Sequence, residues 1–202
     1  MVTKHFPWLL QAYNRFPHKI MRADFARILY MSKYGGVYVD LDSECLRPLD
    51  SLLPSIAGAA LGRMSDNPDL HAIPNAFFAS EPAHPFWDFC IATSLQRSSG
   101  PHIKRAPYTM TAPEHVTGPA ALQVALDAFV KNGGGVGRTV TLLPPGVVYP
   151  IDWGLEKSEP WVSACIARRV GRFDGAVCKE WLREKWPDAY MATYWAHSWA
   201  ET

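Results

Sequence analysis

The stretch "IMRADFARILYMSKYGGVYVDLDSE", residues 20–44, joins a helical pattern to a strand pattern that ends in acidic residues. Apolar residues at helical spacing predict a helix over 20–34, and the glycine pair at 35–36 is a typical helix stop. The β-branched and aromatic run "VYVD" at 37–40 predicts a short strand. The strand would deliver the residues after it to the carboxyl edge of a sheet, where open α/β sheets bind ligands.

Three acids follow this strand at alternate positions, namely Asp40, Asp42 and Glu44. If the strand persists, their side chains point the same way, so one hard cation would meet two carboxylates, directly or through water. Magnesium or manganese held by one or two carboxylates and by substrate phosphates is the usual arrangement for these ions. The alternative is a solvated turn after a strand.

Strand patterns and helix patterns alternate along the rest of the chain. Strands are predicted at 58–64, 72–80, 139–144 and 146–150, and helices at 84–96 and 117–131. This alternation indicates an α/β fold, with a mixed sheet flanked by helices. Residues 98–115 carry no usable periodicity and are predicted to be a surface loop.

Composition bounds the class of protein and its partners. The chain has 202 residues, 48% of them hydrophobic, and 20 basic residues against 19 acidic ones. A balanced charge gives no argument for nucleic acid as a partner. No apolar stretch approaches the roughly 20 residues that span a bilayer. The four cysteines lack zinc-site spacing. Cys165 and Cys178 would pair in an oxidising compartment, which the sequence alone leaves open.

The block "RADFARILYMSKYGGVYVDLDSECLRPLD" resembles the DxD region of glycosyltransferases of the Och1 and inositolphosphoceramide mannosyltransferase-like family, related to glycosyltransferase family 32. The core of that family reads approximately D-x-x-R-x-x-x-L-x-x-x-G-G-x-Y-x-D-x-D. The matching positions here are Asp24, Arg27, Gly35, Gly36, Tyr38, Asp40 and Asp42.

The resemblance implies a GT-A-like fold and a role for each matching position. Asp24 would accept hydrogen bonds from the nucleotide ribose, and Arg27 would approach the donor sugar or diphosphate with its planar cationic fork. Tyr38 would also line the donor site. Asp40 would bind ribose or sugar hydroxyls and the ion through water, while Asp42 would ligate the ion. The alternative for Asp24 and Arg27 is an ion pair on a helix surface.

Looser similarities extend the implied site. "NAFFASEPAHPF" places Asn75 at the donor sugar, and "VTGPAAL" places Thr117 at the pocket; the alternatives are a turn cap and a helix cap. The closing "TYWAHSW" resembles an element that folds over the diphosphate, which makes His197 and Ser198 candidate metal ligands and places Trp199 over the leaving group.

The resemblance implies a metal-dependent retaining glycosyltransferase that uses Mn²⁺ or Mg²⁺. It would move a hexose from a nucleotide sugar, GDP-mannose or a UDP-hexose, to a glycan or glycolipid in the Golgi or another secretory lumen. Residues 1–202 read as a single catalytic domain that is N-terminally incomplete and lacks the first strand of the family. Membrane contact is expected only through a segment not present here. The alternatives are a non-catalytic carbohydrate-binding relic and a DxD magnesium phosphatase.

Overall fold

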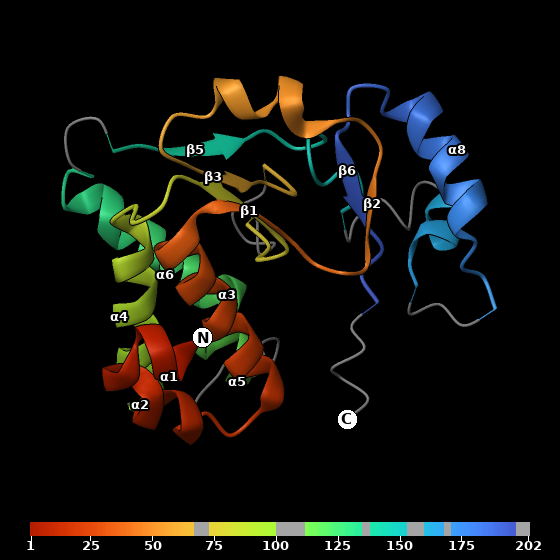
Figure 1. The fold of residues 1–202 in the computed structure, drawn as a ribbon. Coiled ribbons are helices and arrows are strands. Elements are labelled where there is room, and N and C mark those ends of the chain that lie inside the picture. Colours follow the sequence, from red (N-terminus) through yellow and green to blue (C-terminus); the bar gives the residue numbers. More distant parts are fainter. Residues whose placement is uncertain (67–72, 100–111, 135–137, 153–159, 168–170, 197–202) are drawn as a thin grey trace. The chain divides into compact units, whose positions relative to one another are not determined.

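The computed structural model describes residues 1–66, 73–99, 112–134, 138–152, 160–167 and 171–196 (Figure 1). Its α-helices are α1 (Val2–His5), α2 (Leu10–Arg15), α3 (Lys19–Tyr34), α4 (Phe86–Ser98), α5 (Ala112–Val116), α6 (Pro119–Lys131) and α8 (Gly175–Lys185). Short 3₁₀ helices are η1 (Pro7–Leu9), η2 (Leu49–Ser51), η3 (Leu53–Ser55) and η5 (Pro160–Cys165). The strands are β1 (Gly36–Val39), β2 (Ser43–Cys45), β3 (Ala59–Gly62), β4 (Phe77–Ser80), β5 (Val140–Leu143) and β6 (Met191–Thr193).

The strands form two sheets. The larger has the order β1-β4-β3-β5, in which β3 and β4 are antiparallel, and the smaller pairs β2 with β6 antiparallel. The prediction of an α/β fold with a mixed sheet flanked by helices is confirmed. The chain divides into two compact units. Unit 1 contains residues 1–38, 56–61 and 73–141, and unit 2 contains the remaining residues.

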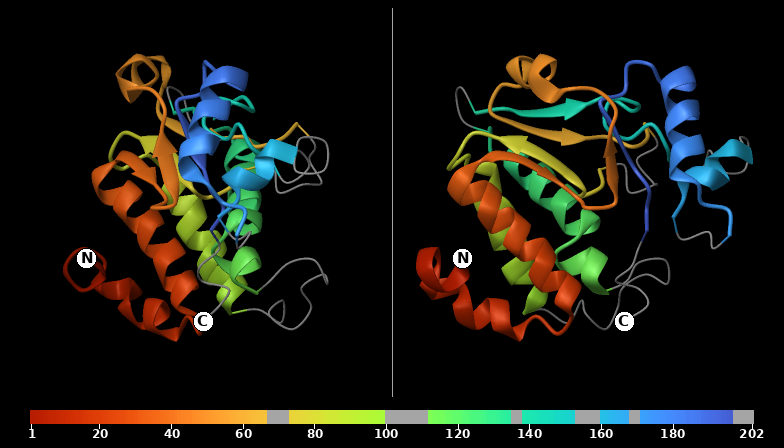
Figure 2. Two further views of the ribbon diagram at one scale, coloured as in Figure 1. Left: turned by 90° about the vertical axis from the view of Figure 1, so that its right-hand side faces the viewer. Right: turned by 45° about the vertical axis from the view of Figure 1, so that its right-hand side comes forward.

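The helices of unit 1 form a tightly packed layer. Helix α4 packs against α3 and α6, and the three lie side by side in both views of Figure 2. The predicted helix at 20–34 is confirmed as α3, whose apolar residues Met21, Phe25 and Leu29 are fully buried. Phe16 packs against Phe25 with ring centroids 5.1 Å apart. The apolar stripe therefore fixes which face of α3 points inward, and so where its polar residues lie.

The glycine pair after α3 is required for two different reasons. Gly35 has φ of +60°, and a Cβ atom there would lie 2.5 Å from the backbone nitrogen of Pro82 and 2.6 Å from the carbonyl oxygen of Ser80. Gly36 has φ of +86° but nothing within 4 Å of the same added atom. Both positions need glycine for the backbone, and only Gly35 also needs it for space.

We expect Gly35→Ala to lower the free energy of unfolding by about 2 kcal/mol, because it adds a backbone clash to a glycine-only conformation. Gly36→Ala is the matched control and should cost about 1 kcal/mol, since it has only the conformational penalty. Urea unfolding of both variants measures the difference. Equal losses would show that the close approach of Gly35 to the 80–82 backbone is not a constraint.

The strand predicted at 146–150 is wrong. These residues form a turn in which Gly146 has φ of +90° and the Val147 amide donates to the Pro144 carbonyl at 3.3 Å. The β-branched residues predicted a strand, but two prolines precede Gly146, and the ring of Trp186 would lie 2.4 Å from a Cβ at that glycine. Turn chemistry and close packing override strand propensity here.

The loop predicted at 98–115 is also partly wrong. Ser98 is the last residue of α4, and α5 occupies 112–116, while residues 100–111 lie outside the described part of the chain. Before β1 the fully described residues 1–35 contain helices and no strand.

Candidate functional site

A buried carboxylate, Asp24, organises the polar residues of unit 1. It is 4% exposed, and its Oδ1 accepts from Asn75 Nδ2 at 3.0 Å while its Oδ2 accepts from the Thr117 hydroxyl at 3.0 Å. The guanidinium of Arg27, one turn later on α3, lies 3.1 Å from Oδ1. We call these residues, together with Tyr38, the Asp24 cluster.

Arg27 is held in place by three neighbours. Besides facing Asp24, its Nη1 donates to the backbone carbonyl of Asn75, and its guanidinium carbon lies 4.8 Å from the ring centroid of Tyr38. The ring of Tyr38 in turn packs against Phe78 on β4 at 5.8 Å. A guanidinium fixed in this way keeps its planar fork in one orientation, as recognition of a phosphate or of sugar hydroxyls requires.

All five donor-site residues predicted within unit 1 are therefore in one cluster. Asp24 and Arg27 do not form the surface ion pair that was the alternative for them, because they are buried, at 4% and 7% exposure. Helix α6 has Gly118 as its N-cap, so Thr117 is not the helix cap and serves Asp24 instead. A carboxylate offers about four acceptor positions, so a ligand hydroxyl would share Asp24 with these protein donors.

The DxD segment in unit 2 is a turn between two strands. Strand β1 ends at Val39, a turn follows at 41–42, and β2 begins at Ser43. The condition that the strand persists through Glu44 is therefore not met, and the expectation that all three acids point the same way loses its basis. Leu41, at the tip of the turn, is fully exposed.

Asp42 is anchored to the C-terminal segment through both its backbone and its side chain. Its carbonyl accepts from the Tyr194 amide at 2.8 Å, and its Oδ2 accepts from the Ala196 amide at 2.8 Å. A backbone amide on one carboxylate oxygen fixes the plane of the group and leaves Oδ1 with no hydrogen bond to the residues that the structure describes. Asp42 is half-buried, so part of the residue is accessible to solvent.

The chemistry of the DxD turn fits a hard divalent ion that is held mainly by substrate phosphates and water rather than by protein side chains. Within the described ranges, no group of three or more His, Cys, Asp or Glu side chains is close enough to form a protein-only metal site. Asp40 and Asp42 would supply the carboxylates of such a site, in which phosphates and water would complete the shell. The predicted ligands His197 and Ser198, like Trp199, lie outside the described residues.

The third acid has a different partner. Glu44 forms an ion pair with Lys179 of α8, and the hydroxyl of Tyr194 also hydrogen-bonds to Glu44. Burial, together with the charge of Glu44 and this hydrogen bond, raises the pKa of Tyr194 to about 12, so the phenol stays protonated at neutral pH. Glu44 thus helps to hold β2 and α8 together rather than extending the predicted ion site.

Sequence reasoning missed the partners of the DxD segment. Strands β2 and β6 pair with Ser43 opposite Thr193, and the two hydroxyl oxygens lie 3.2 Å apart. The three residues of β6 are fully buried. The short "MAT" run at 191–193 is β-capable, but no local signal says which strand it joins, because 150 residues separate Ser43 from Thr193.

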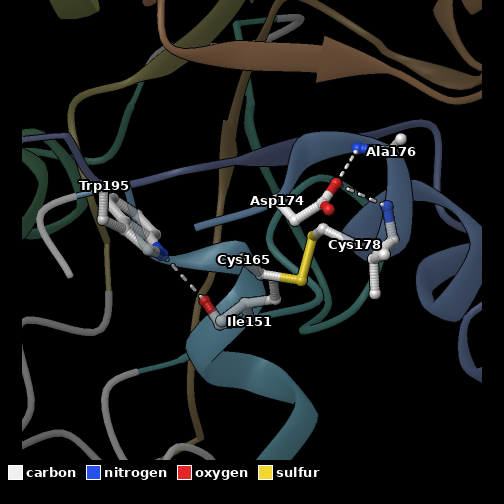
Figure 3. The surroundings of a disulfide bond; sticks show 7 residues. Ile151, Cys165, Asp174, Ala176, Cys178 and Trp195 are labelled. Carbon is white, nitrogen blue, oxygen red and sulfur yellow. Dashed lines mark hydrogen bonds between the residues drawn. A yellow bond between two sulfur atoms is a disulfide. The ribbon is translucent and has the colours of Figure 1, made fainter. Parts of the chain in front are cut away.

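A disulfide supports this part of unit 2 (Figure 3). Cys165 and Cys178 are bonded, and both are fully buried, so the pairing that the sequence left open is present. It joins η5 to α8, whose N-terminus is capped by Asp174 through the amides of Ala176 and Val177. The Cys178 end of the disulfide is the neighbour of Lys179, the residue that pairs with Glu44.

Comparison with known proteins gives a match over the N-terminal part of the chain, which contains the DxD turn. Residues 1–57 match a family described as "Glycosyltransferase sugar-binding region containing DXD motif". The Schizosaccharomyces pombe protein named inositol phosphoceramide mannosyltransferase 3 is 46% identical over 52 residues, which are 26% of this chain and 15% of that protein. The Saccharomyces cerevisiae mannosyl phosphorylinositol ceramide synthase CSH1 is 36% identical over 86 residues, 43% of this chain and 21% of that protein.

Two further comparisons are more distant. The initiation-specific alpha-1,6-mannosyltransferase of S. cerevisiae is 42% identical over 45 residues, 22% of this chain and 9% of that protein. Among solved structures, the PaToxG glycosyltransferase gives a TM-score of 0.40 at 18% identity, covering 66% of this chain and 43% of that one. The matched stretch spans less than a quarter of the length of each of these three curated relatives. The resemblance to DxD-motif glycosyltransferases of the Och1 and inositolphosphoceramide mannosyltransferase-like family is thus confirmed, and the family model places the DxD-motif region on residues 1–57 of this chain.

Proposed function

We propose that this chain is the donor-binding part of a metal-dependent, retaining glycosyltransferase that moves a hexose from a nucleotide sugar to a hydroxyl acceptor. The observation that carries the proposal is the Asp24 cluster. Arg27, Asn75 and Thr117, which the family resemblance assigns to the donor together with Asp24, all contact the buried Asp24 carboxylate, although Thr117 is 93 residues from Asp24 in the sequence. Tyr38 joins the cluster through Arg27. The GT-A assignment and the single-domain reading of residues 1–202 belong to the same proposal.

The proposed mechanism is electrostatic. A divalent ion, Mn²⁺ or Mg²⁺, would neutralise the charge that grows on the departing diphosphate. Asp42 would hold this ion through the carboxylate that the Ala196 amide orients, with Asp40 contributing through water. His197 and Ser198 are proposed as further ligands because they directly follow Ala196 in the sequence. In the same proposal, Trp199 covers the leaving group and helps to exclude water.

The Asp24 cluster would bind the uncharged and anionic parts of the donor. Arg27 would present a fixed cation to the sugar or diphosphate, and Asp24 would accept hydrogen bonds from ribose hydroxyls. Asn75 and Thr117 orient Asp24 by donating to its two oxygens. We assign no catalytic nucleophile, because retention can use the departing oxygen of the donor itself as the base.

The names of the relatives guide the choice of substrates and compartment. They are mannosyltransferases, two of them named for inositol phosphoceramides, so we propose GDP-mannose ahead of UDP-hexoses and a glycolipid or glycan acceptor. The buried Cys165–Cys178 disulfide supports an oxidising compartment such as the secretory lumen. Among the described residues, no helix is both long enough and apolar enough to cross a bilayer.

The test is titration calorimetry of the chain with GDP-mannose and UDP-hexoses, with Mn²⁺ and without it, followed by assay of donor hydrolysis. We expect one nucleotide sugar to bind only when Mn²⁺ is present and to be slowly hydrolysed. Metal-dependent binding with no turnover would favour a binding relic. Failure of every donor to bind, or release of phosphate from phosphomonoesters instead, would overturn the proposal.

A further inference from the structure

The first 34 residues carry a charge that the whole chain does not. They contain six basic residues and one acid, whereas the full sequence has 20 basic and 19 acidic residues. The single acid, Asp24, is buried and faces Arg27. The segment therefore has a net positive charge, while the rest of the chain is net negative.

Part of this positive charge lies next to exposed aromatic rings of unit 1. Tyr30 and Tyr34 on α3 are 50% and 52% exposed, and their ring centroids lie 6.0 Å apart. The Tyr34 hydroxyl is 3.0 Å from Nε2 of His5 on α1. Lys4 and Lys33 are exposed beside them. Lys4 directly precedes His5 and Lys33 directly precedes Tyr34 in the sequence. The pKa of His5 is lowered by desolvation and then by the positive charges of these two lysines.

We propose that this basic-aromatic face (Lys4, His5, Tyr30, Lys33 and Tyr34) docks the protein on an anionic bilayer surface. Tyrosine is amphipathic and favours the boundary between headgroups and acyl chains. Lysine near an anionic leaflet is attracted by its surface potential and keeps its charge in water while its stem covers apolar surface. Exposed Trp8, in η1 and 72% exposed, adds a third interfacial ring to the same N-terminal segment.

The geometry favours a bilayer over the other polyanion, a nucleic acid. Single-stranded nucleic acids bind by stacking bases on aromatic faces. A base between two rings needs about 7 Å between their planes, twice a van der Waals contact of about 3.5 Å. Tyr30 and Tyr34 pack on each other at 6.0 Å, and the Tyr34 edge is occupied by His5. The rings thus form a continuous surface rather than separate stacking platforms.

This inference does not depend on the proposed activity. Co-sedimentation with vesicles tests it. We expect binding to phosphatidylcholine vesicles that contain phosphatidylserine, none to phosphatidylcholine alone, and release at high salt. Lys4→Gln with Lys33→Gln should weaken partition roughly 20-fold, since each basic residue at an anionic surface contributes about a factor of five.

The matched control is Lys131→Gln with Lys185→Gln, which removes the same charge from exposed lysines outside the face and should leave partition unchanged. Tyr30→Ser with Tyr34→Ser should weaken the part of vesicle binding that remains at moderate salt. Circular dichroism checks that this variant is folded. Equal losses of vesicle binding from the two lysine pairs would show that net charge drives binding rather than the basic-aromatic face, and would overturn the proposal. So would failure to bind anionic vesicles, or tighter binding to a labelled oligonucleotide at the same salt.

Discussion

Asp42→Asn is expected to lower metal-dependent turnover of the nucleotide sugar about 100- to 1000-fold while leaving the fold intact. The substitution removes the charge that would hold the ion, and loss of charge stabilisation at a leaving group costs this much in other enzymes. In the unsubstituted protein the Ala196 amide donates to Oδ2 of Asp42 at 2.8 Å, and the side-chain oxygen of asparagine can accept the same hydrogen bond. The anchor between the DxD turn and the C-terminal segment therefore survives, and charge alone is tested.

Two measurements test whether Asp42 holds the ion. Turnover is measured against Mn²⁺ concentration, and Mn²⁺ affinity is measured by electron paramagnetic resonance in the presence of the nucleotide diphosphate, which needs no turnover. Asp50→Asn is the control, because it removes one exposed carboxylate from the same unit without touching the DxD turn. If Asp42→Asn binds Mn²⁺ as the control does, the ion does not use Asp42 and the proposed metal site fails.

Asp42→Ala separates the two roles of this residue. It removes the charge and also the acceptor of the Ala196 amide, so any extra loss of stability beyond Asp42→Asn measures the anchor. A hydrogen bond of a backbone amide to a charged group contributes about 1.5 to 3 kcal/mol. The two variants together distinguish holding the ion from holding the C-terminal segment.

How far the sequence predicted this molecule depends on the range of the interactions involved. Helix α3 and its glycine stop follow from patterns local to residues 20–36, and both are confirmed. The turn at 144–147 shows the opposite outcome, since the ring of Trp186, distant in sequence, helps to decide against a strand. Local propensity is reliable where no tertiary contact competes with it.

The candidate site divides in the same way. Asp24 and Arg27 are one turn apart on a helix, so their proximity was predictable. Asn75 and Thr117, at separations of 51 and 93 residues from Asp24, came from family resemblance, since no periodicity links them to α3. The pairing of Glu44 with Lys179, across 135 residues, had no signal at all, and the acid was interpreted with its sequence neighbours instead.

Asp24→Asn is expected to have the largest effect on stability, lowering the free energy of unfolding by about 3 to 5 kcal/mol. The substitution removes the carboxylate that faces the Arg27 guanidinium at a site where both side chains are less than 10% exposed. It also replaces one carboxylate oxygen by an amide NH₂, so either Asn75 Nδ2 or the Thr117 hydroxyl loses its acceptor. Urea unfolding measures the loss.

A surface carboxylate provides the matched control for this variant. Asp127 on α6 accepts from Gln123 Nε2 at 2.9 Å but is exposed, so Asp127→Asn should cost less than about 0.5 kcal/mol. Combining Asp24→Asn with Arg27→Met should recover part of the loss, because removing both partners of a buried ion pair costs less than removing one. If Asp24→Asn costs no more than Asp127→Asn, the carboxylate does not organise the cluster. The donor residues of unit 1 would then have to be positioned by the packing of α3, α4 and α6 alone.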